Sequence, residues 1–455
     1  MLRPPSATGQ WTALGEVGDS LRQLGYTASG LSEALGSEGP LVEGRTVGDR
    51  RRRARRAGAV GVLARLLLMG ERLTFDECRP LPPTTLDRLL ESGLLGEDGG
   101  HVEASVGLVP HDDLLVAADR LGSDAGADIV PGVQPPSFLL GCLTIRAPVQ
   151  RALDLGTGCG IQALLLSAFA GQVVATDVSE RALQFAELNA ALNHRRNITF
   201  RQGDLFEAVK GETFGLLVSN PPYVISPDNA FTYRDSARGG EQIGADVVEG
   251  AGGHLDAGGH ATILVSWDAS GADPLERPRS WIPPGCDALV LGSARDIEVN
   301  AERWNVGPDR DSAVERWIQY FEGRGISHVG YGAVVLRKRE SEYPLVRSLE
   351  IGDQIDRPAG RVLQRMFDAR RVTSEDRVRL VGTARVSDRS RLDAAGWVVE
   401  DRELMLLDGL GFHISLDDET AALVEALDGR PLPSLGADAL AYVDRLVSLG
   451  FAEIC

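Results

Sequence analysis

A glycine-rich turn at residues 154–160 (DLGTGCG) restricts the fold of this chain more than any other feature. It follows an apolar run and precedes a helical pattern, so it is expected to join a strand to a helix. Glycine lets the backbone turn tightly and approach a ligand without a Cβ in the way. Ile161 stands where the dinucleotide pattern G-x-G-x-x-G needs its third glycine, which disfavours hydride transfer. We expect a nucleotide-like group at this turn.

Around this turn, from about residue 131 to 340, short apolar runs alternate with helical patterns. Strands that alternate with helices form open, doubly wound α/β sheets, so a Rossmann-like fold is expected. Ligands of such sheets bind beyond the carboxyl ends of the strands, and the chemistry is expected there. The seven predicted strands are 151–155, 172–177, 198–202, 216–219, 261–265, 288–291 and 333–336.

An acidic residue, Asp177, ends the predicted strand that follows the glycine-rich turn, about 20 residues further along. A carboxylate at this position can accept hydrogen bonds from both hydroxyls of a ribose. Its position and its chemistry therefore agree with a nucleotide-like ligand.

The fourth predicted strand ends in Asn220, Pro221, Pro222 and Tyr223. A planar NH2 group is a poor nucleophile because its lone pair is delocalised, and two acceptors that bind its hydrogens can align it for attack. The Asn220 side-chain oxygen and the Pro221 carbonyl are two such acceptors, and they would stabilise the positive charge that develops. The prolines stiffen the loop, and Tyr223 offers a ring for stacking on an amide or a base. The alternative is a proline-stiffened turn with a buried aromatic ring.

Over about residues 131–340 these segments resemble the class I S-adenosylmethionine-dependent methyltransferases. The wider pattern, which includes Asn189-Ala190 and Gly203-Asp204-Leu205-Phe206, looks most like the HemK/PrmC branch, which methylates a glutamine side-chain amide in peptide-release factors. The resemblance implies that Asp204 lies beside the adenine amine and that the turn backbone faces the methionine part of the cofactor. For Asp154 the alternative is a buried acid that orders the loop, and for Asp204 it is a plain turn residue.

The resemblance also gives the residues expected in the site. The catalytic residues are Asn220, Pro221, Pro222 and Tyr223. The residues expected to bind S-adenosylmethionine are Asp154, Gly156, Thr157, Gly158, Gly160, Asp177, Val178, Gly203, Asp204, Leu205 and Asn220.

The methyl acceptor is less closely defined than the cofactor. The family's proline-arginine-proline-glutamate segment before the first motif is replaced here by residues 133–137 (VQPPS), which weakens the transfer of the release-factor substrate. A similar loop occurs in N-methyltransferases that act on ribosomal RNA and DNA. We expect a protein glutamine amide first, with an adenine or guanine base of RNA or DNA, a small molecule or a modified peptide as alternatives. A protein that binds S-adenosylmethionine without catalysis is the rival from another class.

Two regions flank the predicted core, in keeping with a chain of 455 residues. Residues 1–130 have mostly helical patterns, and a helix followed by the alternating run 101–109 is typical of a winged helix. Residues 341–455 hold helical patterns near 417–427 and 437–449 and predict a small domain, for which a second winged helix is one option. The predicted domains are 1–130, 131–340 and 341–455.

Composition excludes several other classes of protein. The 47 basic and 65 acidic residues give a net charge of −18, which argues against indiscriminate binding to polyanions. No apolar run is long enough to span a membrane and no signal peptide is evident, so a cytoplasmic protein without a membrane partner is expected. The five cysteines are far apart, and the consecutive His111, Asp112 and Asp113 cannot converge on one ion, so no metal is expected.

Two local patterns bear on the partner, which is expected to be a macromolecular substrate. Seven arginines between positions 45 and 56 accompany a single acid, Asp49, and could contact nucleic-acid phosphates; a solvated helix start is the alternative. Residues 233–236 (YRDS), with Gly239 and Gly240, could form a lid over the substrate, and a surface pair of Arg234 with Asp235 is the alternative.

Overall fold

The computed structural model describes residues 11–36, 47–120, 126–228, 233–234, 239–305, 309–339, 344–352, 355, 358–393, 396–407, 409–431 and 437–455. The chain forms two compact units. The first combines the residues up to 138 with 148–247, and the second combines 139–147 with 248–455. The three-part division at 130/131 and 340/341 stays a prediction.

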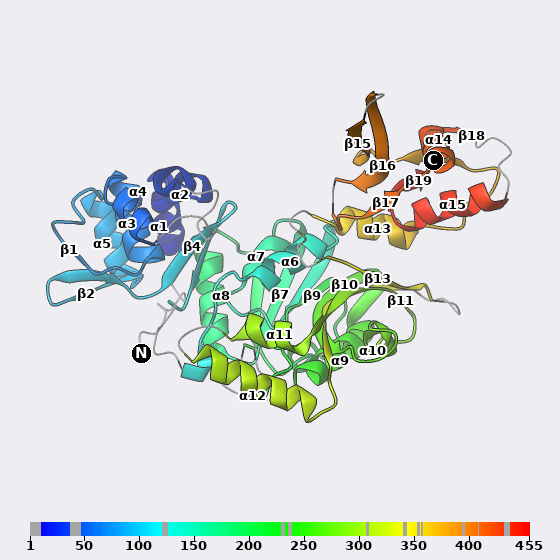
Figure 1. The fold of residues 1–455 in the computed structure, drawn as a ribbon. Helices are drawn as coiled ribbons and strands as arrows, with labels where there is room; N and C mark the ends of the chain where they lie inside the picture. Colours follow the sequence, from blue (N-terminus) through cyan, green and yellow to red (C-terminus); the bar gives the residue numbers. More distant parts are fainter. Residues whose placement is uncertain are drawn as a thin grey trace. The chain divides into compact units, whose positions relative to one another are not determined.

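Four parallel strands form the sheet of the first unit: β6 (Val149–Leu155), β7 (Ala170–Asp177), β8 (Ile198–Gln202) and β9 (Phe214–Ser219) (Figure 1). Their order across the sheet is β9-β6-β7-β8. In β7 and β9 four consecutive residues are buried, as expected of parallel strands covered on both faces. Helix α7 (Ile161–Leu166) follows β6, and helix α8 (Glu180–Leu192) follows β7. The helical pattern that follows the turn continues in the sequence to Ala170, but α7 ends at Leu166 and β7 begins at Ala170.

The strand order creates a topological switch point between β6 and β9. From β6 the chain moves through β7 to β8 on one side and then returns to β9 on the other. Ligands of doubly wound sheets bind beyond the carboxyl ends of the strands at such a point. Leu155 at the end of β6 pairs with Ser219 at the end of β9, so the two strands end at the same level.

The N-terminal part of the first unit is helical and carries two small β structures. Its helices are α1 (Trp11–Gln23), α2 (Ala28–Leu35), α3 (Val47–Ala54), α4 (Gly58–Leu63) and α5 (Pro83–Glu91). After α5 comes a hairpin of β2 (Leu95–Asp98) and β3 (His101–Ala104), and the short β1 (Leu73–Thr74) pairs with β3. The winged-helix assignment of this region stays a prediction.

A separate hairpin joins β4 (Gly107–His111) to β5 (Leu114–Ala118). The alternating run expected at residues 101–109 is therefore two strands in two different sheets, since the chain leaves the first sheet after Ala104. All five residues of β5 are buried. The hairpin is thus a packed part of the first unit.

The second unit carries strands β10 (Leu255–Asp268), β11 (Cys286–Asp296), β12 (His328–Lys338) and β13 (Val346–Glu350). Strand β12 pairs antiparallel with β10 and β11, and β13 runs parallel to β11. All seven predicted strands are therefore confirmed as strands, and β13 is an addition. Its sequence, VRSLE, has no apolar run because its residues are only partly buried. The helices of this part are α10 (Glu276–Ser280), α11 (Ile297–Trp304) and α12 (Arg310–Glu322), whereas α9 (Gly240–Ala251) begins in the first unit and the division at 247/248 falls within it.

The C-terminal part of the second unit is built from short elements. Helices lie at the two predicted positions, where Asp417 and Thr420 form a capping box at the start of the first. The three-stranded sheet at residues 384–415, which contains a long hairpin, was not predicted, because its strands are rich in charged residues. The helices are α13 (Gly360–Asp368), α14 (Asp418–Glu425) and α15 (Ala437–Ser448), and the strands are β14 (Arg377–Leu380), β15 (Ala384–Asp393), β16 (Gly396–Leu406), β17 (His413–Ser415), β18 (Asp428–Pro431) and β19 (Ala452–Ile454).

Among the helices of the described residues, none has the length and apolar character needed to cross a membrane. Within the same residues, no group of three or more His, Cys, Asp or Glu side chains is arranged to hold a metal ion.

Candidate active site

The sheet register of the first unit brings the predicted site segments side by side. Leu155 pairs with Ser219 on one side and with Thr176 on the other, and Asp177 pairs with Gln202. The residues at or just beyond these pairs therefore follow one line along the carboxyl edge: Asn220, Gly156, Asp177 and Gly203. Neighbouring strands lie about 4.8 Å apart, so the line from the β9 end to the β8 end covers roughly 14 Å.

Asp154 is buried and is engaged by the glycine-rich turn itself. Its Oδ2 accepts a hydrogen bond from the Thr157 hydroxyl at 2.6 Å and another from the Ala163 backbone N–H at 2.9 Å. Burial raises the pKa of Asp154 to about 7, and the nearby Asp177 contributes in the same direction. These contacts match the alternative given for this residue, a buried acid that orders the loop.

The three glycines of the turn all have positive φ, at 75° for Gly156, 54° for Gly158 and 84° for Gly160. A Cβ added at Gly156 or Gly158 would meet nothing within 4 Å, so both positions border open space. A Cβ at Gly160 would lie 2.8 Å from the Cβ of Ala186, so this glycine is needed for the contact between the turn and α8. The first two glycines thus leave room for a ligand, and the third fixes the turn on its helix.

Asp177 stands at the end of β7 with both carboxylate oxygens in use. Oδ2 accepts the Gly158 N–H at 2.9 Å, and Oδ1 accepts the Ser179 N–H at 2.9 Å. Burial raises the pKa of Asp177 above its ordinary value. Each carboxylate oxygen has a second lone pair, so acceptor capacity remains for hydroxyl groups. The neighbouring Val178 is 64% exposed, which leaves an apolar side chain open beside this carboxylate.

The predicted adenine-side residues follow β8. The Gly203 N–H donates to the Asp177 carbonyl at 3.1 Å, which joins the two strand ends. A Cβ at Gly203 would lie 2.8 Å from the Cβ of Ala208, so the turn is closely packed. Asp204 accepts the Glu207 N–H through its carbonyl, and Leu205 has a φ of 48°, unusual for a residue with a side chain.

The Asn220–Tyr223 segment follows β9 at the switch point. Asn220 is half-buried, and Pro221 is buried. The Tyr223 N–H donates to the Pro221 carbonyl at 2.8 Å, so this carbonyl already accepts one bond and keeps one lone pair. Tyr223 is only 3% exposed, so its ring is not the open stacking surface that the sequence predicted. The ring is buried, as in the alternative given for this loop.

The predicted lid is only partly within the described residues. Asp235 and Ser236 lie outside them, while Arg234 pairs with Asp228 at 3.6 Å. Gly240 begins α9, and a Cβ there would lie 2.4 Å from the Tyr223 carbonyl oxygen. Helix α9 therefore starts in close contact with the Asn220–Tyr223 loop.

Two buried asparagines, one on α8 and one just beyond it, were not among the predicted site residues. Asn189 and Asn193 are 0% and 7% exposed, and both bind the backbone of β5. Their four-residue spacing places them on one side of the helix, and an uncharged polar pair within an apolar helical pattern is the signal that could have found them.

Residues 134–276 of the chain match the family described as methyltransferase small domain. Residues 23–105 match a domain of unknown function (DUF7059). The first of these matches covers the glycine-rich turn, the ends of β7 and β8 and the Asn220–Tyr223 loop.

Curated relatives match over part of the chain. A release factor glutamine methyltransferase of Xylella fastidiosa (strain Temecula1) is 38% identical over 139 residues, which are 28% of this chain and 50% of the relative. One of Deinococcus radiodurans is 43% identical over 117 residues, 24% of this chain and 40% of the relative. A ribosomal protein uL3 glutamine methyltransferase of Bordetella pertussis is 46% identical over 85 residues, 18% and 28% of the two chains.

The chain thus spans half or less of the length of these curated relatives. A solved methyltransferase structure from Pyrococcus furiosus matches at 18% identity over 49% of this chain and 89% of that one, with a TM-score of 0.29. The family match and the curated relatives support a class I S-adenosylmethionine-dependent methyltransferase of the HemK branch.

Proposed function

We propose that this chain is an S-adenosylmethionine-dependent N-methyltransferase whose acceptor is the side-chain amide of a glutamine in a protein. The observation that carries the proposal is the register of β6 and β9, because the pairing of Leu155 with Ser219 sets Asn220 beside Gly156 at the switch point. A group held by the glycine-rich turn and a nitrogen held by Asn220 would then be neighbours.

The residues of the first unit fit the proposed cofactor. Gly156 and Gly158 border open space, the Asp177 carboxylate keeps lone pairs for ribose hydroxyls, and Val178 offers an exposed apolar side chain for adenine. Gly203, Asp204 and Leu205 continue the same edge toward the adenine side. Asp154 and Thr157 would act through the turn, since their side chains bind each other. Bound S-adenosylmethionine supplies an electrophilic methyl group on a sulfonium.

The acceptor nitrogen would be held by groups of the Asn220–Tyr223 loop. The Asn220 Oδ1 and the free lone pair of the Pro221 carbonyl would each accept one N–H of the amide. This turns the nitrogen lone pair toward the methyl group and stabilises the positive charge that develops on nitrogen. The methylated nitrogen then loses its extra proton to water, so no strongly basic side chain is needed.

The choice of a protein glutamine rests on the relatives. Release-factor and ribosomal-protein glutamine methyltransferases are both among the curated relatives of this chain. A substrate of the translation machinery also fits the expectation of a cytoplasmic protein with a macromolecular partner. The substitution of residues 133–137 (VQPPS) for the family's segment points to a different fit around the substrate backbone.

The proposal is tested by incubating the purified chain with methyl-labelled S-adenosylmethionine and the peptide-release factors and ribosomal proteins of its source, followed by mass spectrometry of tryptic peptides. The expected result is one added methyl group on a glutamine side chain, absent with Asn220→Ala. Label in protein at another residue type, or in no protein, would overturn the glutamine assignment. Binding of S-adenosylhomocysteine without turnover on any substrate class would favour the non-catalytic rival.

A base amine of RNA is a second candidate, favoured by the arginines of α3. The side chains of Arg51, Arg52 and Arg53 are 51%, 68% and 42% exposed, although they pair with Glu71 or Asp49. Arg45 lies outside the described residues. If RNA is the acceptor, label will appear in nucleosides, and replacing the arginines at 50–53, 55 and 56 by glutamine will flatten the salt dependence of turnover.

A further inference from the structure

Two segments that are distant from each other in the sequence, the glycine-rich turn and strand β5, meet on one side of α8. Gly160 of the glycine-rich turn packs on Ala186, one helical turn before Asn189. Strand β5 of the N-terminal hairpin runs along the same side and contacts Asn189 and Asn193. Helix α8 starts three residues after Asp177, whose carboxylate accepts the Gly158 N–H. One helix therefore connects the proposed cofactor site with the N-terminal region.

Asn189 is the residue that contacts both of the other segments. Its Oδ1 accepts the Ala117 N–H at 2.7 Å, and its Nδ2 donates to the Ala117 carbonyl at 2.8 Å. The same Nδ2 donates its second hydrogen to the Cys159 carbonyl of the turn, also at 2.8 Å. All the hydrogens of this carboxamide are used, and the side chain is 0% exposed.

Asn193 repeats the contact with the hairpin but not the contact with the turn. Its Oδ1 accepts the Leu115 N–H at 2.9 Å, and its Nδ2 donates to the Leu115 carbonyl and to the Asn189 carbonyl, both at 2.7 Å. Each carboxamide thus replaces a neighbouring strand for one residue of β5. The two asparagines differ in that only Asn189 binds the glycine-rich turn.

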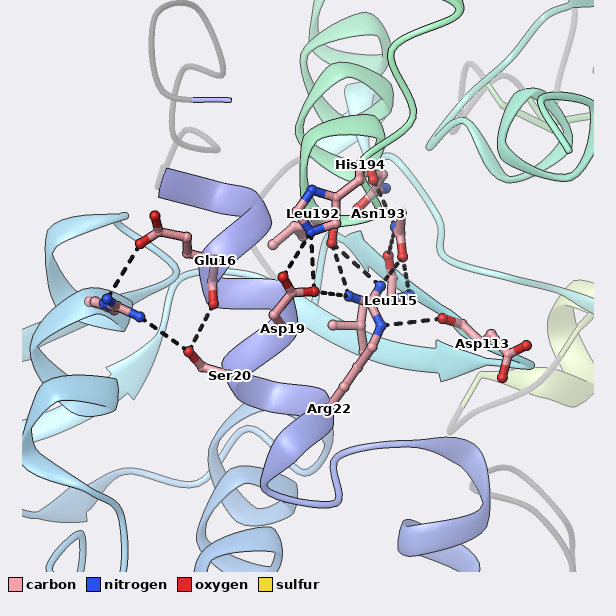
Figure 2. A network of polar contacts seen from close by, with 11 residues as sticks. Glu16, Asp19, Ser20, Arg22, Asp113, Leu115, Leu192, Asn193 and His194 are labelled. Atoms are coloured by element: carbon pink, nitrogen blue, oxygen red, sulfur yellow. Dashed lines mark hydrogen bonds and ion pairs between the residues drawn. The ribbon is translucent and has the colours of Figure 1, made fainter. Parts of the chain in front are cut away.

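Helix α1 contacts the C-terminal end of α8 (Figure 2). The Arg22 guanidinium donates to the Leu192 carbonyl at 3.4 Å and to Asn193 Oδ1 at 2.5 Å, and thereby caps the end of α8. The His194 ring lies 3.1 Å from the Asp19 carboxylate. A Cβ at Gly18 would lie 2.2 Å from the Leu192 carbonyl oxygen, so the two helices meet at backbone distance. Helix α1 and strand β5 of the N-terminal region therefore both pack directly on α8.

We propose that Asn189 is a positioning residue that holds the Cys159 carbonyl, and with it the glycine-rich turn, in the conformation that binds S-adenosylmethionine. Through the same carboxamide, the seating of the β4–β5 hairpin on α8 is linked to the affinity of the turn for the cofactor. This inference rests on the proposed cofactor site. Its physical basis is that a buried carbonyl without a donor is costly, so loss of Asn189 shifts the turn toward conformations in which Cys159 finds another partner.

The experiment compares Asn189→Ala with Asn193→Ala, because both remove one clamp on β5 and only the first frees the turn. Titration calorimetry with S-adenosylhomocysteine is expected to give a Kd for Asn189→Ala about tenfold weaker than wild type, because the buried Cys159 carbonyl loses its donor. For Asn193→Ala the Kd is expected to stay within about twofold of wild type. Thermal unfolding is expected to show that both variants are less stable than wild type. Hydrogen exchange of the unliganded proteins is expected to rise in residues 156–161 for Asn189→Ala alone.

The outcomes separate the inference from the function on which it rests. Failure of the wild type to bind S-adenosylhomocysteine would overturn the proposed cofactor site. Binding by the wild type with equal affinity in both variants, or with equal loss in both, would overturn the assignment to Asn189 alone. If Asn189→Ala does not fold, Asn189→Asp carries the same comparison, since it keeps the acceptor for the Ala117 N–H and loses both donated hydrogens.

Discussion

The two halves of the candidate site are held in place by different means. On the cofactor side, the Asp154 carboxyl group accepts the Ala163 N–H of α7, and the Asp177 carboxylate accepts backbone N–H groups of the glycine-rich turn and of the residue just before α8. On the acceptor side, Pro221 and Pro222 have no N–H to donate, and their rings fix the backbone directly. The first half depends on directional bonds to charged groups, whereas the second depends on covalent stiffness. The two halves should therefore respond to different substitutions.

Asn220→Ala is expected to give the largest difference between an effect on turnover and an effect on cofactor affinity. Loss of one acceptor that acts in the transition state should lower turnover roughly 10²–10³-fold. The Kd for S-adenosylhomocysteine should change by less than about threefold, because this acceptor acts mainly on the second substrate. Labelled methyl transfer and calorimetry measure the two quantities.

The matched control for Asn220→Ala is Asn197→Ala. Asn197 binds the carbonyls of Ser167 and Ala170 at the opposite, amino-terminal edge of the sheet. Its replacement should affect stability and leave turnover near wild type. Equal loss of turnover in both variants would mean that Asn220 has only a structural role.

Asp177→Ala tests the cofactor half in the same way. It removes the anchor of the Gly158 N–H and the acceptors for ribose hydroxyls, each a bond to a charged group worth about 1.5–3 kcal/mol. We expect S-adenosylhomocysteine to bind roughly 10–100-fold more weakly, measured by calorimetry. Asp128→Ala, which removes the acceptor of the Ser179 hydroxyl but leaves the hydrogen bonds of the Asp177 carboxylate in place, is the control and should bind nearly as wild type. Unchanged affinity in Asp177→Ala would remove this carboxylate from the site.

Asp154 makes the cofactor half sensitive to pH. Burial raises its pKa from 3.8 to about 7, so between these values the folded protein keeps a proton that the unfolded chain has lost. The contribution of Asp154 to stability is therefore complete below about pH 4 and falls as the pH rises toward 7, by up to about 1.4 kcal/mol per pH unit.

Asp154→Asn removes this titration. Denaturant unfolding of both proteins from pH 4.5 to pH 8 should show the free energy of unfolding of the wild type falling relative to that of the variant as the pH rises, with no further relative change above about pH 7. Curves that stay parallel over the whole range would show that Asp154 is already ionised in the folded protein.

The smallest effect is expected on the acceptor half, from Pro222→Ala. The variant gains conformational freedom in the unfolded state, which should lower the free energy of unfolding by about 0.4–1 kcal/mol. Stability at every pH should fall by the same amount, since no titrating group is involved, and denaturant unfolding at two pH values measures this. No loss at all would mean that Tyr223 and α9 hold the loop without the proline ring.

The sequence predicted the strands of the sheet well, because buried parallel strands are continuous apolar runs with few competing interpretations. It also predicted which residues stand at the strand ends, since Asp177 and Asn220 directly follow such runs. It could not decide between an open and a buried ring at Tyr223, because burial depends on how distant segments pack. The strands β13, β15 and β16 were missed because their charged residues interrupt any apolar pattern, and the partner of β13 also lies far away in the sequence.

The packing of the N-terminal region on α8 also limits where this protein can be truncated and whether that region can be exchanged. The matched methyltransferase segment begins at residue 134, and a fragment cut near that boundary would lose Arg22 and strand β5. The carboxamides of Asn189 and Asn193 would then lie uncovered on an apolar helix face, and such a fragment is expected to aggregate. During evolution, an N-terminal region of this kind cannot be exchanged as a free module, because a replacement must present two backbone amides and two carbonyls to the same pair of asparagines.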